Sequence, residues 1–206
     1  AAYSPLQKGA YNNADIERFA YDPEKTERLL VEAGWSKGAD GYYQTDGERL
    51  AFTIAAMADY QVRVDMAAMC ASQLQQIGAD VSAETRQSLD WAGQEACIIG
   101  WGSPFDPDDH TYKIFTTDAG DNYTAYSDAE VDRLLAEARH TEDEAARTEL
   151  YRAFQERLTE HLPYTFIAYV DADYAMKATI QGITENTVLG HHGVGVFWNI
   201  AQWSMD

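Results

Sequence analysis

The chain has 206 residues, of which 46% are hydrophobic and 12% aromatic, and its net charge is −19. This composition argues against a disordered chain. The excess of 34 acidic over 15 basic residues argues against nucleic acid as a partner, because phosphate binding needs clustered Lys and Arg. No apolar run approaches the roughly 20 residues of a membrane span, and the length suits one compact domain or a domain with arms.

The first residues read AAYSPLQKGAYNN, which contains neither a start methionine nor a charged n-region. We therefore expect a mature form or an excised part of a longer protein. The two cysteines, Cys70 and Cys97, lie in different predicted elements, and we expect both to be small buried core residues. Their spacing leaves a disulfide between them open.

Residues 1–20 are polar and irregular, which indicates an arm. Asp22-Pro23 predicts the start of a helix, with Asp as the N-cap and Pro in the first turn. The stretch GADGYYQTDGERLAFTIAAMA is typical of a hairpin, because Asp46-Gly47 can form its turn and apolar residues alternate after it.

A βαβ unit is predicted next. The strand that carries Phe52 and Ile54 is followed by a helix with apolar residues at near i, i+4 spacing, which ends at Gly78, and then by the short strand ADVSAE. A strand, a helix and a strand in about 35 residues imply a sheet that is at least partly parallel. RQSLDWAGQ predicts a short helix, and EACIIGW has the continuous apolar run of a buried central strand.

Two amphipathic helices follow. The first is predicted to begin with a capping box from Ser127 to Glu130 and the second with one from Thr141 to Glu144. Pro163 ends the second helix, YTFIAYV predicts a strand, and the last 30 residues are Gly-rich and apolar. The expected buried positions are Val131, Leu134, Leu135 and Ala138 in the first helix and Ala146, Leu150, Phe154, Leu158 and Leu162 in the second.

Motifs of catalysis are absent from the sequence. It contains no P-loop, no dinucleotide-binding Gly-rich loop, no GxSxG elbow and no HExxH. Cys70 and Cys97 have no His nearby at nucleophile or ligand spacing. His191-His192 lies in LGHHGVGV without a third ligand, so a plain loop is favoured over a metal site. We expect no enzyme activity, no metal site and no cofactor.

The acidic stretch DPDDH does not fit a calcium loop, because the Gly of the sixth position and the Glu of the twelfth are absent. Asp106-Pro107 repeats the cap signature of the first helix. Asp108 and Asp109 would then lie in the first helical turn, where negative charge favours the helix dipole.

The segment WGSPF lies between the carboxyl end of a predicted strand and the start of this helix, a place where ligands bind in open α/β sheets. Trp101 can cover an apolar ligand face, and Gly102 lets a ligand approach the backbone. The alternative is that Trp101 packs under the next helix, and spacing leaves both interpretations open.

Four stretches occur in a fixed order: YDPEKTERLLVEAGW, GWGSPFDPDDH, NYTAYSDAEVDRLLAEAR and RTELYRAFQERLTEHLPYTFIAY. In this order the chain resembles the family 5 extracellular solute-binding proteins, the peptide- and nickel-type receptors of ABC importers, over residues 20–206. The resemblance implies an α/β fold, a periplasmic-binding-protein-like lobe with a mixed, partly parallel sheet flanked by helices. It also implies a two-lobed protein that closes on its ligand, delivers it to the permease subunits and performs no chemistry.

Members of the family are more than twice as long, so the resemblance implies that this chain is the carboxyl-terminal portion. Residues 1–20 would be an irregular hinge-side arm, residues 21–171 the ligand-binding lobe, and residues 172–206 a return segment that packs on the absent first lobe. The expected location is extracellular or periplasmic. A lipoprotein anchor would hold the receptor to the membrane through the absent amino-terminal region.

The resemblance further implies that Trp101, Gly102, Ser103 and Phe105 contact the ligand, with the two aromatic residues as the lip of the cleft. Many peptide-binding members carry an acid between GW and DP that receives the peptide amino terminus, whereas this chain has GSPF there. The form resembles the nickel-chelate branch, although His110 is not at the place of the metal-binding His of some members. We expect a short peptide, with a nickel chelate or other small polar solute as the alternative.

Overall fold

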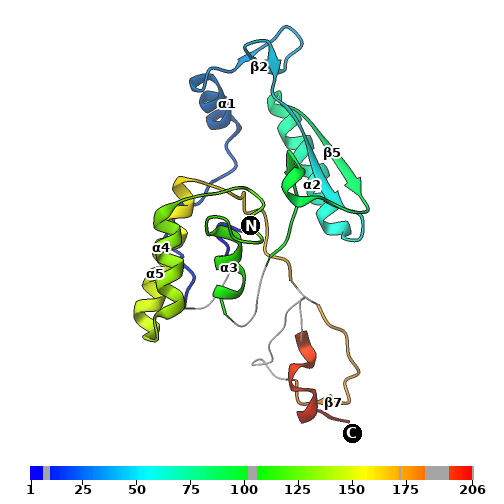
Figure 1. Ribbon diagram of the computed structural model, residues 1–206. Helices are drawn as coiled ribbons and strands as arrows, with labels where there is room; N and C mark the ends of the chain where they lie inside the picture. The colour runs from blue at the N-terminus through cyan, green and yellow to red at the C-terminus, as the bar shows by residue number, and fades with distance from the viewer. Residues whose placement is uncertain (7–9, 102–105, 172, 184–194, 206) are drawn as a thin grey trace. The chain divides into compact units, whose positions relative to one another are not determined.

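The computed structural model describes residues 1–6, 10–101, 106–171, 173–183 and 195–205 (Figure 1). Contacts divide the chain into two compact units, of which one comprises Phe19–Gly100 and the other Ala1–Arg18 with Trp101–Asp206. The sequence predicts one body over residues 21–171 and no division within it. The structure instead divides this range between Gly100 and Trp101. Whether residues 21–171 act as one lobe in a longer protein stays a prediction.

The first unit begins with helix α1, Pro23–Glu32, and an antiparallel sheet of β1 (Ser36–Lys37), β2 (Tyr43–Thr45) and β3 (Glu48–Arg49). The side chain of Asp22 accepts a hydrogen bond from the Lys25 amide at 2.8 Å, which confirms the predicted cap. Asp46 (φ 50°) and Gly47 (φ 83°) both have positive φ, as a tight hairpin turn requires.

The predicted βαβ unit is confirmed. Strand β4 (Ala51–Met57), helix α2 (Gln61–Ile77) and strand β5 (Asp80–Arg86) follow one another, and β4 pairs in parallel with both β5 and β6 (Ala96–Cys97). The sheet order is β5-β4-β6. The short helix before β6 is the 3₁₀ turn η1, Trp91–Gly93. Strand β6 is shorter than predicted.

The second unit is built on three helices, α3 (Asp108–Phe115), α4 (Ala129–His140) and α5 (Glu144–Glu160), of which α4 and α5 lie side by side (Figure 1). All four apolar positions predicted for α4 are buried, as are Phe154 and Leu158 of α5. The core consists of Leu6, Ile114, Phe115, Val131, Leu134, Leu135, Ala138, Tyr151, Phe154 and Leu158.

Both helices begin at caps other than those predicted. The N-cap of α4 is Asp128, whose carboxylate accepts from the amides of Glu130 (2.9 Å) and Val131 (3.1 Å). The N-cap of α5 is Asp143, which accepts from the Ala146 amide at 2.8 Å. In each case an Asp lies within two residues after the predicted Ser or Thr, and a carboxylate is a strong acceptor for the amides of a helix start.

The buried face of α5 differs in part from the prediction. Ala146 is exposed and Leu162 is 45% exposed, whereas Tyr151 and Gln155 are buried. The reason is the amino-terminal segment, because the Gln155 side chain accepts from the Ser4 hydroxyl at 2.9 Å and donates to the Tyr11 carbonyl at 2.7 Å. Residues 1–6 and 10–18 are irregular, as predicted, and pack against this helix.

The predicted strand over residues 164–170 is wrong, since this part of the chain has irregular backbone. The backbone of Ile167 accepts one hydrogen bond from the Ala2 amide, at 3.1 Å. Further on, β7 (Ile180–Gln181) pairs antiparallel with β8 (Ser204–Met205), and the 3₁₀ segment η2 (Gly195–Gln202) precedes β8.

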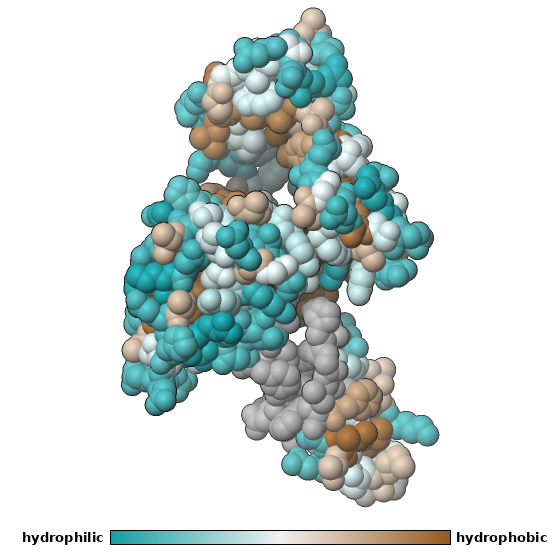
Figure 2. Space-filling model, in the orientation of Figure 1, coloured by the Kyte–Doolittle hydropathy of each residue, from teal (hydrophilic) through white to brown (hydrophobic). Residues whose placement is uncertain are grey.

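Apolar surface gathers on the carboxyl-terminal segment, where Figure 2 shows brown atoms over the region of β7 and η2. Phe197 is 56% exposed, Ile200 57% and Met205 77%. Helix α1 is also apolar on its surface, with Leu29 53% and Val31 61% exposed. Among the described residues, no helix combines the length and apolar character that crossing a membrane requires.

Candidate functional site

The start of α3 is organised by the carboxylate of Asp106. One of its oxygens accepts from the Asp108 amide at 2.8 Å, and the Asp106 carbonyl accepts from the Asp109 amide at 3.2 Å. Asp108 and Asp109 lie in the first turn of α3. The structural interpretation of DPDDH is confirmed in part: Asp108 and Asp109 lie in the first turn as predicted, but the N-cap is Pro107 and not Asp106.

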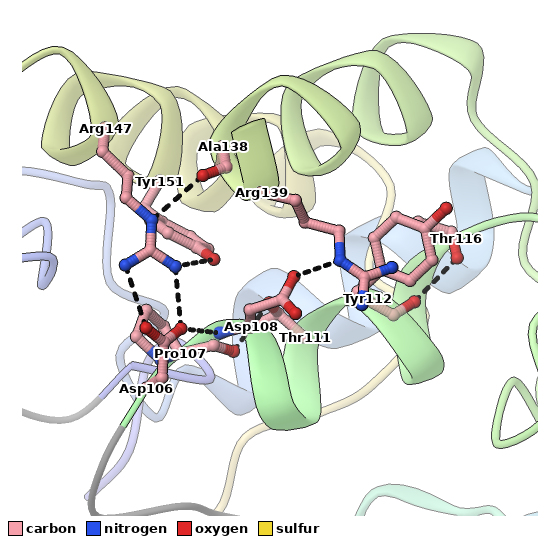
Figure 3. Close-up of polar contacts among 10 residues, drawn as sticks. All are labelled: Asp106, Pro107, Asp108, Thr111, Tyr112, Thr116, Ala138, Arg139, Arg147 and Tyr151. Atoms are coloured by element: carbon pink, nitrogen blue, oxygen red, sulfur yellow. Dashed lines mark hydrogen bonds and ion pairs between the residues drawn. The ribbon is translucent and has the colours of Figure 1, made fainter. Parts of the chain in front are cut away.

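Arg147 of α5 binds Asp106 with two parallel hydrogen bonds, from Nη1 at 3.0 Å and from Nη2 at 2.7 Å (Figure 3). Its Nε donates to the Ala138 carbonyl at 3.0 Å, and the two Nη atoms also reach the hydroxyls of Tyr11 at 3.2 Å and Tyr151 at 3.4 Å. The side chain of Arg147 is only 17% exposed. This guanidinium lowers the pKa of the Asp106 carboxyl and keeps the carboxylate charged.

Two tyrosine rings also lie close to the Arg147 guanidinium. The guanidinium carbon lies 5.3 Å from the ring centroids of both Tyr11 and Tyr151, within the range of cation–π attraction. Burial raises the pKa of Tyr151 to about 12, so the Tyr151 hydroxyl stays neutral and accepts from the guanidinium.

A second Arg–Asp pair involves Asp108, the first residue of α3. Arg139, in the last turn of α4, places its Nε 3.1 Å from a carboxylate oxygen of Asp108. Its guanidinium lies over the Tyr112 ring, 3.9 Å from the centroid (Figure 3). The Arg139 side chain is 43% exposed, so it is more open to water than Arg147.

Trp101 is the predicted site residue that the structure places. Its ring packs against the hydrophobic core of the second unit and remains half-buried. It stacks on Tyr123, with ring centroids 5.9 Å apart and an interplanar angle of 30°. The indole Nε1 is buried and has no hydrogen-bond partner among the described residues. Core packing, the alternative left open by the spacing, is therefore part of the role of Trp101.

Tyr123 lies in a loop that Asn122 holds in place. The Asn122 amide donates to the carbonyls of Thr116 at 3.0 Å and Tyr126 at 2.7 Å, and its oxygen accepts from the Tyr126 amide at 3.1 Å. The Tyr123 hydroxyl donates to Asp121 at 3.2 Å. Sequence reasoning did not assign Tyr123 to the site, although it lies in the NYTAYSD stretch that carries the family resemblance.

The other predicted site residues, Gly102, Ser103 and Phe105, lie outside the described residues, as does His191-His192. His110 is buried in α3, where burial lowers its pKa and Nε2 lies 3.4 Å from the Pro5 carbonyl oxygen. No group of three or more His, Cys, Asp or Glu side chains suited to a metal occurs among the residues that the structure describes.

Cys70 and Cys97 are both half-buried free thiols. Burial raises the pKa of each thiol, so both stay protonated near neutral pH and lack the thiolate character of a nucleophile. The expectation that they are small, inward-facing residues is met in part, since neither is fully buried.

Comparison with protein families defines the class of the chain. Residues 1–124 match the model for bacterial extracellular solute-binding proteins, family 5, middle part. Because the match covers more than half of the chain, the chain belongs to this family. Its α/β architecture with a parallel sheet is that of the periplasmic-binding-protein fold of its structural neighbours.

Individual relatives of the chain include peptide-binding proteins. The chain is 28% identical over 215 residues to the oligopeptide-binding protein AppA of Bacillus subtilis, a match that covers 97% of this chain and 38% of AppA. It is 30% identical over 179 residues to di/tripeptide-binding protein 1 of Pseudomonas aeruginosa, covering 81% of this chain and 31% of that protein.

Two solved structures of relatives superpose over most of the chain. NikZ from Campylobacter jejuni, in complex with Ni(L-His), gives a TM-score of 0.83 at 36% identity and covers 94% of this chain and 41% of NikZ. AppA in complex with a nonapeptide gives a TM-score of 0.81 at 27% identity, covering 100% of this chain and 42% of AppA. The chain thus spans about two fifths of the length of these relatives.

Proposed function

We propose that this chain is the carboxyl-terminal part of a solute-binding receptor that captures a short peptide and delivers it to the permease of an ABC importer. The observation that carries the proposal is the likeness to AppA along the whole chain, at a TM-score of 0.81. Proteins of this kind bind their ligand in a cleft between two lobes, which close around it. The activity is binding and release, without chemical turnover.

A nickel chelate is the second candidate, and two observations favour it. The likeness to NikZ reaches 36% identity, above the 27% shared with the AppA structure. The four residues between Trp101 and Asp106 read GSPF, which supplies no carboxylate to receive a peptide amino terminus. A compact chelate held by aromatic rings and by residues of the other lobe needs no such carboxylate.

The ligand site is proposed to include Trp101, Gly102, Ser103 and Phe105, with Tyr123 as a further wall behind Trp101. Residues 21–171 would form the main body of the ligand-binding lobe and residues 1–20 its hinge-side arm. Residues 172–206 would pack on the first lobe, and the exposed Phe197, Ile200 and Met205 support that assignment because such surface is usually covered by a partner.

The family name places these receptors outside the cytoplasm. We infer that a lipid anchor on an amino-terminal region holds this receptor at the membrane surface, beside its permease subunits. Labelling of intact cells with a membrane-impermeant reagent, followed by mass spectrometry of the intact protein, tests both the location and the anchor.

A calorimetric screen of the full-length protein tests the proposed ligand. Peptides of two to nine residues form one arm, and Ni²⁺ with and without L-histidine forms the other. Stoichiometric binding of peptides alone supports the first candidate, and binding of nickel–histidine without peptide binding supports the second. Binding of neither class contradicts the proposed function.

A further inference from the structure

We propose that Tyr169 is a positioning residue for lobe closure, because its hydroxyl joins the amino-terminal segment of residues 1–6 to the segment of residues 164–171. The inference rests on the proposed function, in which residues 1–20 are the hinge-side arm and residues 172–206 return to the first lobe. The two joined segments would then move as one body with the helical core of α3, α4 and α5. The bending that closes the lobes would take place beyond them.

The first reason is that the two segments lie side by side and are joined by several contacts. The Tyr169 hydroxyl donates to the Ser4 carbonyl at 3.0 Å and accepts from the Ser4 amide at 3.4 Å. The Ala2 amide donates to the Ile167 carbonyl at 3.1 Å. The rings of Tyr3 and Tyr169 meet edge to face, with centroids 6.2 Å apart. Ser4 and Tyr169 are 165 residues apart in the sequence, so only the fold brings them together.

The second reason is that this joint is attached to helix α5. The Gln155 side chain is buried and accepts from the Ser4 hydroxyl at 2.9 Å and from the Asn13 amide at 3.1 Å. Its amide nitrogen donates to the carbonyls of Tyr11 at 2.7 Å and Tyr151 at 2.9 Å. An amide side chain has two donor hydrogens and an oxygen with two lone pairs, so its capacity is fully used. Ser4, which is itself buried, therefore connects the joint to the helical core.

The third reason is the backbone of the two segments. Residues 1–6 and 164–171 are irregular, so individual contacts hold them together in place of a strand ladder. Segments with few hydrogen bonds open at a low free energy, and a single hydroxyl that makes two of these bonds then has a large effect. Lobes connected through loose segments sample more orientations. Closing them around a ligand costs more conformational entropy, which lowers affinity without the loss of a ligand contact.

Tyr3 provides a matched control. Like Tyr169 it is a half-buried tyrosine, and its hydroxyl donates a hydrogen bond of 3.0 Å to the Asn12 side chain. That bond stays within the amino-terminal part of the chain. Tyr3→Phe and Tyr169→Phe each remove one oxygen atom and keep the contact between the two rings. Of the two variants, Tyr169→Phe is the one that removes a bond between the two segments.

The first test compares the full-length protein with both variants by hydrogen exchange and mass spectrometry, without ligand. Within residues 1–6, the amides of Ala2, Ser4 and Leu6 donate hydrogen bonds, so this stretch reports on the joint. Its exchange should be about 3- to 10-fold faster in Tyr169→Phe, since loss of one hydrogen bond shifts an opening equilibrium by about that factor. Tyr3→Phe should change it by less than about twofold. Equal exchange in the two variants would overturn the inference.

Calorimetry with the peptide or nickel–histidine complex that the screen identifies gives the second readout. Tyr169→Phe should raise the dissociation constant about 3- to 10-fold, since closure then has to order the released segments, and Tyr3→Phe by less than about twofold. Lower stability with unchanged affinity would mean that Tyr169 only holds the fold, and would overturn the proposal. A screen without any ligand contradicts the proposed function, whereas the exchange of residues 1–6 still decides whether the joint exists.

Ser4→Ala tests the attachment of the joint to α5. It removes the hydroxyl that donates to Gln155 and accepts from the Leu6 amide, and it keeps the backbone atoms that bind Tyr169. Exchange of residues 1–6 should again be faster. In the double variant with Tyr169→Phe the two effects should be less than additive, because α5, Ser4 and Tyr169 form one series of contacts. Fully additive effects, or unchanged exchange in Ser4→Ala, would contradict the inference.

Discussion

At the scale of single residues, the core packing of Trp101 and its proposed role in ligand binding can be tested separately. We expect Trp101→Ala to weaken ligand binding by the full-length protein about 10- to 100-fold, as loss of an aromatic contact at a binding hot spot does. Because the ring is half-buried against the core, stability should fall by about 1.5 to 3 kcal/mol, less than for a fully buried ring. Titration calorimetry and urea denaturation of the same variant give both numbers.

A large loss of stability with unchanged affinity would leave Trp101 as a core residue alone, and the ligand site would then have to lie elsewhere. Trp101→Phe is the matched control. It keeps an aromatic ring on Tyr123 and should therefore lose less affinity and less stability than Trp101→Ala.

Asp106 predicts a specific dependence of stability on pH. Arg147 lowers the pKa of Asp106 below the ordinary 3.8 in the folded protein. A carboxyl with a lowered folded pKa stabilises the protein fully above its unfolded pKa, and this contribution is lost as the pH falls through the folded pKa. Asp106→Asn should therefore be less stable than the wild type at neutral pH.

This difference in the free energy of unfolding should shrink as the pH falls below 3.8. Urea denaturation of both proteins at a series of pH values measures it. A difference that stays constant from about pH 7 to about pH 3 would show that the ion pair with Arg147 does not stabilise the fold.

Sequence reasoning at this scale predicted that Asp106 bonds the start of α3, and it left open whether Trp101 packs on the core or faces a ligand. It missed Arg147 and Tyr123, because their partners are distant in the sequence. Arg147 lies 41 residues from Asp106 and 136 from Tyr11. On α5, Arg147 is one charged residue among many, and no spacing marks it as buried.

At the scale of secondary-structure elements, the helix caps give a direct test. Asp128 bonds two amides of α4 and lies 2.8 Å from the Arg157 guanidinium, with its side chain only 8% exposed. Asp128→Ala should lower the free energy of unfolding by about 2 kcal/mol, from the lost cap and the unpaired Arg157. Chemical denaturation measures it.

Ser127→Ala is the matched control for that prediction. The Ser127 hydroxyl lies 3.0 Å from the Thr117 hydroxyl at an exposed position and makes no contact that starts the helix. Its removal should cost about 0.5 kcal/mol or less. A larger cost for Ser127→Ala than for Asp128→Ala would contradict the observed cap and restore the capping box that the sequence predicts.

Element prediction succeeded where the signal is local. The helical period of Val131, Leu134, Leu135 and Ala138 marks the buried face of α4, and a hairpin turn follows from Asp46-Gly47 alone. The strand predicted over residues 164–170 failed because an apolar run becomes a strand only beside another strand. Whether such a neighbouring strand exists depends on the fold and cannot be read from the apolar run.

At the scale of the whole molecule, the account rests on a chain that spans about two fifths of its relatives. The family was predictable because several motifs occur in one order along the chain. The ligand was not, since a cleft receptor divides its contacts between lobes. In the proposed receptor, these residues supply one side of such a site.

The most direct test of this account is therefore a paired titration. The 206-residue chain and the full-length protein are titrated in the calorimeter with the same peptide or nickel–histidine complex. We expect the full-length protein to bind one equivalent tightly. The 206-residue chain should bind at about millimolar strength or weaker, a free energy of about −4 kcal/mol, because half of the contacts are absent. Tight stoichiometric binding by the 206 residues alone would contradict a site shared between two lobes.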